Sequence, residues 1–382
     1  MKFAYLAIVF GAATAASGST LDKKSEFAQG EPIDDNGKGG PILGGTNHQI
    51  DLQNPDNLGA ESTDAGTVVN LKWSFSNSKT KIFNGGRTRE QVVTDIPAST
   101  DIAGAQQHLK KGAVRELHWH RVAEWGFVYT GEVLVSAVDE NGDYQVDKLQ
   151  VGDIWYFSKG SAHTVQGLAD ENEYLFAFDD GNFDALGTTF MVDDWIIHTP
   201  PEVLAKNFGV NASVFTTVPT PDPYILNGTV STANSTGASA GLFGNSSYVN
   251  FPIATTIAAA IVNLEPNGLR ELHWHPNAAE WLCFINGTGR ATIFLGSATA
   301  RTFDFTSGDT AVFPDNSGHH IENTSATQNL TWIELYKSDR VADISLTQWL
   351  ALTPSDIVAN TLKIPLSVVQ QLKKQKELLL KG

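Results

Sequence analysis

The chain has 382 residues, of which 41% are hydrophobic, so it is long enough and apolar enough to form two ordinary domains. Its formal net charge is −16 at pH 7, and its isoelectric point is near 5.0. This negative field repels phosphate backbones and acidic lipid headgroups, so neither nucleic acid nor a membrane is expected as a partner. A small dicarboxylate substrate would need a local metal ion and an arginine to overcome the same field.

The first residues predict that the protein is exported. Lys2 is followed by an apolar run over 3–13 and by small residues, which is typical of a secretory signal peptide. We expect the signal to occupy 1–18, because the apolar run is too short to span a bilayer. A secreted chain with Asn-x-Ser/Thr sequons is also expected to be a glycoprotein. The sequons start at Asn211, Asn227, Asn234, Asn245, Asn286, Asn323 and Asn329.

Composition divides the rest of the chain into an arm, two domains and a linker. Short apolar strands separated by Gly, Asn and Asp turns fill both domains, whereas the arm and the linker are rich in Pro, Gly, Ser, Thr and Asn. We expect helices over 200–208 and in the tail over 355–380. The expected boundaries are an N-terminal arm at 19–66, a first domain at 67–215, a linker at 216–247 and a second domain with C-terminal helices at 248–382.

The two domains predicted above are copies of one another. His273 follows His118 by 155 residues, and Trp349 follows Trp195 by 154, so landmarks in the two halves keep nearly the same offset. An internal duplication of strand-rich segments favours two β-barrels or jelly rolls. The single cysteine, Cys283, lies in an apolar strand, where we expect a core residue rather than a catalytic thiol.

The hexapeptide Arg-Glu-Leu-His-Trp-His occurs twice, starting at Arg115 and at Arg270. Because alternate side chains of a β-strand share a face, the two histidines of each copy project together. A carboxylate follows each copy within a few residues, Glu124 in the first and Glu280 in the second. Neutral imidazoles and a carboxylate together predict a site for a divalent transition metal.

Each copy also belongs to a longer pattern that resembles the two motifs of the cupin family. The second motif opens at Gly152 and ends at His163 in the first copy, and it ends at His319 in the second. Ser158 and Asn316 depart from the usual residues, but both occupy turn positions rather than ligand positions. The resemblance implies an all-β fold of two jelly-roll (double-stranded β-helix) cupin domains with a few helices, an irregular N-terminal arm and a helical C-terminal tail.

The same resemblance implies two metal sites of three histidines and one glutamate each. Four protein ligands leave two open positions of an octahedron, enough for a bidentate dicarboxylate or for substrate and O2. The alternative is structural, either paired core histidines or a metal without a catalytic role. The implied ligands are His118, His120, Glu124 and His163 in the first domain, and His273, His275, Glu280 and His319 in the second.

The repeated hexapeptide narrows the resemblance to the bicupin oxalate decarboxylases and oxalate oxidases, as does the Phe-Asp-Asp-Gly run that ends at Gly181. The resemblance covers about residues 40 to 375. It implies two manganese ions per chain, oxalate as substrate, and assembly as a trimer or hexamer. Arg115 and Arg270 would grip and polarise oxalate, since a guanidinium offers a fixed charge and paired donors. The alternative for both arginines is a surface salt bridge.

A proton donor separates the two activities. After oxalate loses CO2, a placed acid gives formate, whereas reaction with O2 gives a second CO2 and H2O2. Bacterial-type decarboxylases carry this acid as a glutamate on a short lid, and the matching lid here is Asp184, Ala185, Leu186, Gly187 and Thr188. Ala185 fills the glutamate position and cannot transfer a proton. Asp184 is one residue earlier and one methylene shorter, and is the remaining candidate donor in the lid.

Glu334 offers a second candidate donor, because it matches a carboxylate near the second metal of the decarboxylases. We place its first-domain counterpart at Ala177. If Glu334 supplied the proton, decarboxylation would occur at the second site, whereas the resemblance implies that the first site carries the chemistry. We therefore favour an oxalate oxidase with O2 as co-substrate, and oxalate decarboxylase is the alternative. A non-enzymatic storage-type bicupin and a dioxygenase for larger aromatic substrates are weaker alternatives.

Overall fold

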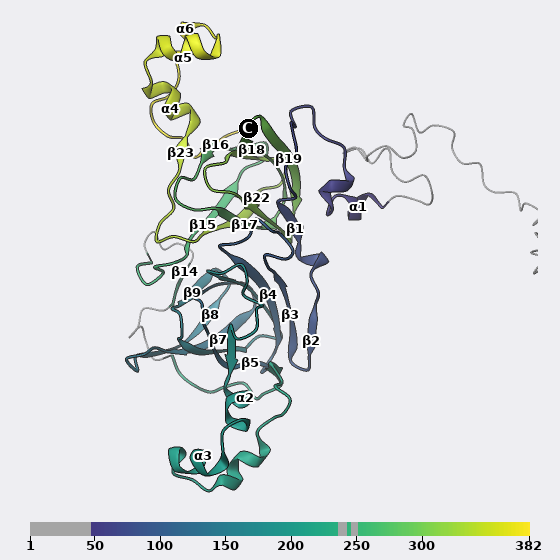
Figure 1. The fold of residues 1–382 in the computed structure, drawn as a ribbon, viewed down its shortest axis with the longest axis vertical. Helices are drawn as coiled ribbons and strands as arrows, with labels where there is room; N and C mark the ends of the chain where they lie inside the picture. The colour runs from purple at the N-terminus through teal and green to yellow at the C-terminus, as the bar shows by residue number, and fades with distance from the viewer. Residues whose placement is uncertain (1–46, 236–242, 246–250) are drawn as a thin grey trace, which may run out of the picture.

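The computed structural model describes residues 47–235, 243–245 and 251–382 of the chain. The predicted signal peptide at 1–18 and the arm up to residue 46 lie outside the described residues. Within them, strands in four antiparallel sheets dominate and the helices are short, which confirms the all-β prediction. Figure 1 shows two barrels stacked along the long axis, with a helical arm at each outer end.

The first barrel is built from two sheets that face each other. One sheet has the order β12-β5-β10-β7-β8 with β13 added on β5, and the other has the order β14-β9-β6-β11-β4-β3-β2. Their bounds are β2 (Lys81–Phe83), β3 (Gly86–Gln91), β4 (Ala103–Lys110), β5 (Val114–His120), β6 (Glu124–Thr130), β7 (Glu132–Val138), β8 (Tyr144–Gln150), β9 (Asp153–Phe157), β10 (Ala162–Gly167), β11 (Glu171–Phe178), β12 (Thr189–Met191), β13 (Ile225–Leu226) and β14 (Phe243–Asn245).

The second barrel repeats this plan. One sheet has the order β19-β18-β21-β16-β23 with β24 added on β16, and the other has the order β1-β20-β17-β22-β15. Strands β5 and β16 therefore hold equivalent places, as the repeated hexapeptide requires. The bounds are β1 (Lys72–Ser74), β15 (Ala258–Leu264), β16 (Leu269–Trp274), β17 (Glu280–Asn286), β18 (Thr288–Gly296), β19 (Thr299–Thr306), β20 (Asp309–Phe313), β21 (Gly318–Asn323), β22 (Leu330–Tyr336), β23 (Ile344–Ser345) and β24 (Leu379–Leu380).

Strand β1 crosses from the first half of the chain to the second barrel. It pairs with β20, and Lys72 forms a buried ion pair of 3.1 Å with Asp309. The sequence pattern assigns residues from 67 onward to the first domain, whereas the structure places strand β1 in a sheet of the second barrel. Two strands of the predicted linker also join a barrel, because β13 pairs with β5 and β14 pairs with β9.

Helices form two arms that leave the barrels at opposite ends (Figure 1). The expected helix over 200–208 is confirmed as α3. In the tail, the helices end at Val369, and the Lys/Glu-rich stretch after it is irregular before β24, contrary to the predicted helix. The helical segments are α1 (His48–Asp51), η1 (Pro55–Asn57), η2 (Phe75–Asn77), α2 (Val192–Ile197), α3 (Pro201–Phe208), η3 (Ala212–Thr217), α4 (Leu346–Leu352), α5 (Ser355–Leu362) and α6 (Leu366–Val369).

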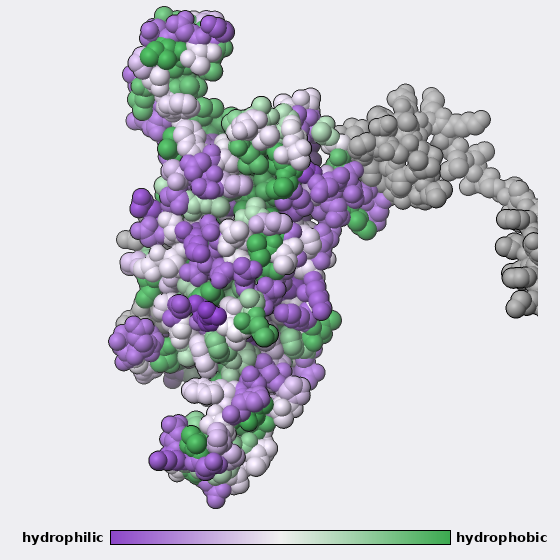
Figure 2. Space-filling view, in the orientation of Figure 1, coloured by the Kyte–Doolittle hydropathy of each residue, from purple (hydrophilic) through white to green (hydrophobic). Residues whose placement is uncertain are grey.

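Alternating side chains separate three apolar cores. Along β6, Val128 faces the core of its own barrel, whereas Trp125 joins a cluster with residues of the second barrel such as Trp281. Cys283 is 1% exposed in that shared cluster, which confirms it as a core residue. The helical arms, in contrast, leave apolar side chains in the solvent (Figure 2), including Trp195 on α2 at 64% exposure. No helix in the described part of the chain is long and apolar enough to cross a membrane.

Candidate metal centres

Three adjacent strands of the first barrel bring one set of predicted ligands together. His118 and His120 come from β5, Glu124 begins β6, and His163 on β10 pairs directly with His118. All four side chains are buried, and their ligand atoms lie within 4.8 Å of one another. One oxygen of Glu124, Oε2, is 3.4 Å from His120 Nδ1 and 3.4 Å from His163 Nε2. We call this set site one.

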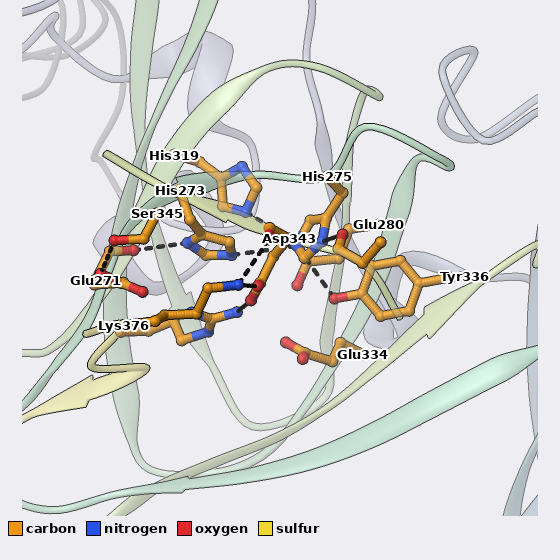
Figure 3. A network of polar contacts seen from close by, with 12 residues as sticks. Glu271, His273, His275, Glu280, His319, Glu334, Tyr336, Asp343, Ser345 and Lys376 are labelled. Atoms are coloured by element: carbon orange, nitrogen blue, oxygen red, sulfur yellow. Dashed lines mark hydrogen bonds and ion pairs between the residues drawn. The ribbon is translucent and has the colours of Figure 1, made fainter. Parts of the chain in front are cut away.

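The second barrel assembles its set in the same way, from β16, β17 and β21 (Figure 3). Oε2 of Glu280 is 3.3 Å from His275 Nε2 and 2.9 Å from His319 Nε2. Nε2 of His273 is 3.2 Å from Nε2 of His275. These four residues are also buried and within 4.8 Å of one another, and we call them site two.

Backbone carbonyls orient most of the imidazoles. A carbonyl oxygen only accepts, so each histidine that contacts one must carry its proton on Nδ1 and leave Nε2 free. In site one, His118 donates to the Glu116 carbonyl at 2.5 Å and His163 donates to the Ser161 carbonyl at 2.9 Å. In site two, the Nδ1 atoms of His273, His275 and His319 lie 2.7–2.9 Å from the carbonyls of Glu271, Ala342 and Ser317.

Burial keeps several of these imidazoles neutral, as metal binding requires. Burial and the charge of Arg115 lower the pKa of His118 well below its ordinary value. Burial, with His319 next, lowers the pKa of His273 to about 2. Burial alone would lower the pKa of His275 too, but Glu280 outweighs it and raises that pKa. In site two, therefore, the Glu280 carboxylate stabilises the charged form of the His275 imidazole.

The buried atoms without hydrogen-bond partners identify where an ion would sit. Among the described residues they include His120 Nε2 and His163 Nε2 in site one, and Glu280 Oε2 and His319 Nε2 in site two. An orphaned buried nitrogen or carboxylate oxygen is costly unless something coordinates it. Three imidazole nitrogens and one carboxylate fit a divalent transition metal, so both predicted ligand sets are brought together as potential metal sites.

The two sites differ in what supports the glutamate ligand. In site one, Trp155 donates its indole N–H to Glu124 Oε1 at 2.8 Å. In site two, a second carboxyl group, Glu334, lies near Glu280 and accepts the indole N–H of Trp332 at 3.1 Å. Burial, followed by Glu280, raises the pKa of Glu334 well above its ordinary value, which favours its protonated form. Site two thus has a buried carboxyl group near its glutamate ligand, whereas the glutamate of site one is held by an indole.

Strand register corrects the first-domain counterpart of Glu334. In the second barrel Tyr336 pairs with Glu280, and in the first Phe178 pairs with Glu124, so Tyr336 corresponds to Phe178. Glu334 lies two residues before Tyr336 and therefore corresponds to Phe176. The assignment to Ala177 was wrong by one residue, and in a strand that places a side chain on the opposite face.

Gly126 is the residue that admits Trp155 to site one. A Cβ on Gly126 would lie 1.9 Å from Trp155 Cε2, inside a fully buried ring. We expect Gly126→Ala to expel the indole from Glu124 and to lower the free energy of unfolding by about 3 kcal/mol, as strong overpacking does. Chemical denaturation measures this loss. In the control Gly318→Ala, the nearest atom to the new Cβ is 3.8 Å away, and a change of about 0.5 kcal/mol or less is expected. Equal losses in the two variants would contradict the explanation.

Both predicted arginines lie buried beside the metal sites, so neither forms the surface salt bridge considered as an alternative. Arg115 is 3% exposed, stacks on the Tyr224 ring at 3.6 Å and forms no ion pair among the described residues. Arg270 is held by Asp343, whose Oδ2 accepts from Nη2 at 2.7 Å. The other guanidinium nitrogen, Nη1, is buried and has no hydrogen-bond partner. Arg270 therefore keeps a free N–H donor beside site two.

The lid of the first domain turns away from site one. Asp184, Ala185, Leu186 and Gly187 are all exposed, and Leu186 is fully exposed. The charge of Asp184 acts on Asp95, outside the metal site, rather than on a ligand. Only Phe183, at the base of the lid, packs on His120, with ring centroids 5.3 Å apart. In this conformation the lid brings no acid to site one.

Three residues near the sites were missed by reasoning from the sequence. Trp155 and Tyr336 lie in apolar strands, where nothing in the local pattern separates a residue beside a metal from an ordinary core aromatic. Asp343 lies in a loop of the second domain and accepts a hydrogen bond from Arg270. The duplication was the one signal in the sequence that could have found them. When the two copies are aligned by strand register, the positions with different side chains in the two barrels stand out.

The chain matches the cupin family twice, over residues 74–214 and 231–370. A probable oxalate decarboxylase of Arthroderma benhamiae is 54% identical over 98% of this chain and 98% of its own length. A second protein of that organism, an oxalate decarboxylase, is 51% identical over 96% of this chain and 97% of its own length.

Among solved structures, the oxalate decarboxylase of Bacillus subtilis, from work on its Mn(II) centres, is 36% identical with a TM-score of 0.83. The likeness covers 92% of this chain and 99% of that one. Both family matches fall on the barrels that carry the histidine–glutamate sites. The chain therefore belongs to the cupin family, as a bicupin with one potential metal site in each of its two cupin domains.

Proposed function

We propose that this protein degrades oxalate, and that it does so as a manganese-dependent decarboxylase that converts hydrogen oxalate to formate and CO2. Relatives named oxalate decarboxylase match it along nearly the whole chain, which favours this activity over the oxidase expected from the sequence. The observation in the structure that carries the proposal is Glu334, a buried carboxyl group near the metal ligand Glu280. A decarboxylase needs such a proton donor and an oxidase does not.

Site two combines the three parts that decarboxylation requires. Its three histidines and Glu280 would hold manganese, which supplies a Lewis acid and redox-capable centre for the substrate carboxylates. The free Nη1 of Arg270 donates to the oxalate anion and fixes its position beside the ligands. Glu334 gives its proton to the carbon that remains after CO2 leaves, forming the C–H bond of formate, and the proton that hydrogen oxalate loses replaces it on Glu334. Manganese is supported by the Mn(II) centres of the Bacillus subtilis relative.

Product analysis with oxalate under air tests the proposal. We expect formate and CO2 in equal amounts, with H2O2 below about one part in ten of the formate. Protein reloaded with manganese after chelation should regain the activity, which separates an inactive preparation from an inactive protein. H2O2 in amounts that match oxalate consumed would contradict the decarboxylase and establish an oxidase.

The oxidase is a second candidate because of one observation, the alanine at position 185 in the lid of site one. Site one has a metal cage and Arg115 but no carboxyl group other than its ligand Glu124 within the cage. Oxalate bound there would have to lose both carbon atoms as CO2, with O2 and two protons forming H2O2.

Ala185→Glu is expected to raise the ratio of formate to H2O2 about tenfold, if any oxalate turns over at site one. The new carboxyl group would stand where the lid can deliver a proton when it closes. Leu186→Glu is the matched control, because it adds the same charge one residue later at a fully exposed position. The same product ratio in Ala185→Glu and in Leu186→Glu would show that the lid does not direct the outcome.

Two further proposals concern where the protein acts and how it assembles. We propose that the protein is secreted, on the strength of the leader-like residues 1–18. We also propose a homo-oligomer, because the helical arms expose Trp195, Phe208, Trp349 and Leu352, which water would disfavour in a monomer. Light scattering on purified protein distinguishes a monomer from a trimer or hexamer.

A further inference from the structure

Three carboxylates meet close to site one, at strand β5. They come from separate segments, because Glu116 is on β5, Asp193 is in the first turn of α2, and Asp222 is in the segment that leads to β13. One oxygen of each lies within 4.8 Å of the others. No part of the oxalate chemistry proposed above uses this group, which we call the acidic cluster.

Each carboxylate of the acidic cluster is held by one backbone N–H. The N–H of Asp193 donates to Glu116 Oε1 at 3.2 Å, that of Asp194 donates to Asp193 Oδ1 at 2.7 Å, and that of Tyr224 donates to Asp222 Oδ1 at 2.7 Å. One oxygen of each group is therefore fixed in direction. The backbone orients the carboxylates without neutralising them.

Two oxygens of the acidic cluster have no partner at all. Glu116 and Asp193 are 4% and 6% exposed, and Glu116 Oε2 and Asp193 Oδ2 are buried without a hydrogen bond. No lysine or arginine forms an ion pair with any member of the cluster among the described residues. Buried anionic oxygens of this kind require a counter-charge.

The second barrel provides an internal comparison at the same place. There Glu271, the equivalent of Glu116, accepts from the Ser345 hydroxyl at 2.5 Å. Ile225 pairs with Arg115 and Leu379 pairs with Arg270, so three residues earlier Lys376 takes the position of Asp222. In the second copy, therefore, Glu271 has a hydroxyl partner and the Lys376 ammonium group contacts the Asp343 carboxylate, whereas the first copy has three carboxylates and, among the described residues, no cation paired with them.

We propose that Glu116, Asp193 and Asp222 bind a hard divalent cation, best matched by Ca2+, at a third site distinct from the two histidine sites. Ligands that are all oxygen favour a hard cation over the transition metals that imidazoles bind. Calcium accepts an irregular ligand set completed by water, which suits ligands from a strand, a helix start and a loop. The bound ion joins β5 to the segment that follows the lid and to the segment that precedes β13.

Equilibrium dialysis of manganese-loaded protein against 45Ca2+ tests this inference. We expect one calcium ion per chain, with a dissociation constant at or below about 10⁻³ M, in the range of extracellular calcium modules. Asp193→Asn and Asp222→Asn should each weaken binding at least tenfold, and Asp222 is only partly buried, so its variant is expected to fold. The matched control is Asp194→Asn, which changes an exposed neighbour and should bind calcium as the wild type does.

Manganese, measured in the same samples, should stay constant as calcium rises, since the two ions occupy different ligand sets. Absence of saturable calcium binding up to about 10 mM would overturn the proposal and assign a shared proton to the acidic cluster. Binding that is unchanged in both Asp193→Asn and Asp222→Asn would also overturn it. Neither result depends on which products the protein makes from oxalate, so the decarboxylase proposal is tested separately.

Discussion

Glu334→Gln is expected to reduce formate production at least 100-fold, the lower end of what a general acid contributes. Glutamine has the same shape, and its amide oxygen can still accept from the Trp332 indole, which donates to Glu334 Oε2 at 3.1 Å. The variant should therefore fold and keep its metal ligands, but it has no proton to give. Formate measured by a coupled dehydrogenase assay, together with metal content, checks the result.

Loss of metal would imitate loss of the acid, so the control must separate them. Glu334→Gln with unchanged manganese and unchanged oxalate affinity, but without formate, would assign the proton to Glu334. The variant is expected to release H2O2 instead, because an intermediate that is not protonated remains open to O2. Formate at the wild-type rate in a fully metallated Glu334→Gln protein would contradict the proposal and move the acid to another group.

The sequence predicted the cage residues because their positions are set locally. Two histidines at alternate positions of a strand face the same way regardless of the rest of the fold. The duplication then presented the same pattern twice, so strand type, ligand type and ligand spacing supported one another. The eight residues from His118 to His319 that were expected as ligands are the eight that the structure brings together.

Residues that support the cages could not be predicted, because their places depend on strand register. The loop between β21 and β22 is longer than the loop between β10 and β11, so a constant offset counted along the chain loses the register of the strands that follow. For this reason Glu334 was matched to Ala177 rather than to Phe176. Strand β1 presents a similar difficulty, since nothing in residues 72–74 shows that their partner lies more than 200 residues away.

The choice between oxidase and decarboxylase also depends on side chains that the sequence does not place in space. The sequence favoured an oxidase because one lid position, Ala185, lacks a carboxyl group. The fold adds that the lid is exposed and that a different acid, Glu334, is buried in the other barrel. Relatives that match nearly the whole chain are named oxalate decarboxylases, so the missing lid carboxyl group alone is weak support for an oxidase.

His319→Ala is expected to abolish formate production, by at least 100-fold, whereas His163→Ala should leave most of it. Mutation of a residue that only orients a metal ligand lowers activity about 10- to 100-fold, and loss of the ligand itself is expected to lower activity by more. The two variants form a matched pair, because each histidine donates its Nδ1 proton to a backbone carbonyl at 2.9 Å and each faces the glutamate ligand of its own barrel. Any difference between them therefore reports which barrel performs the chemistry.

Metal content makes this comparison decisive. Each variant should lose about one of the two manganese ions, and each should lose some thermal stability, since an ion that binds only the folded chain stabilises it. With equal metal loss, loss of formate in His319→Ala alone would place decarboxylation in site two, beside Glu334 and Arg270. Loss of formate in His163→Ala alone would place it in site one, where no acid other than the ligand is present in the cage. That result would require the exposed lid to close and bring Asp184 inward, a motion that a disulfide-free, glycine-containing lid permits.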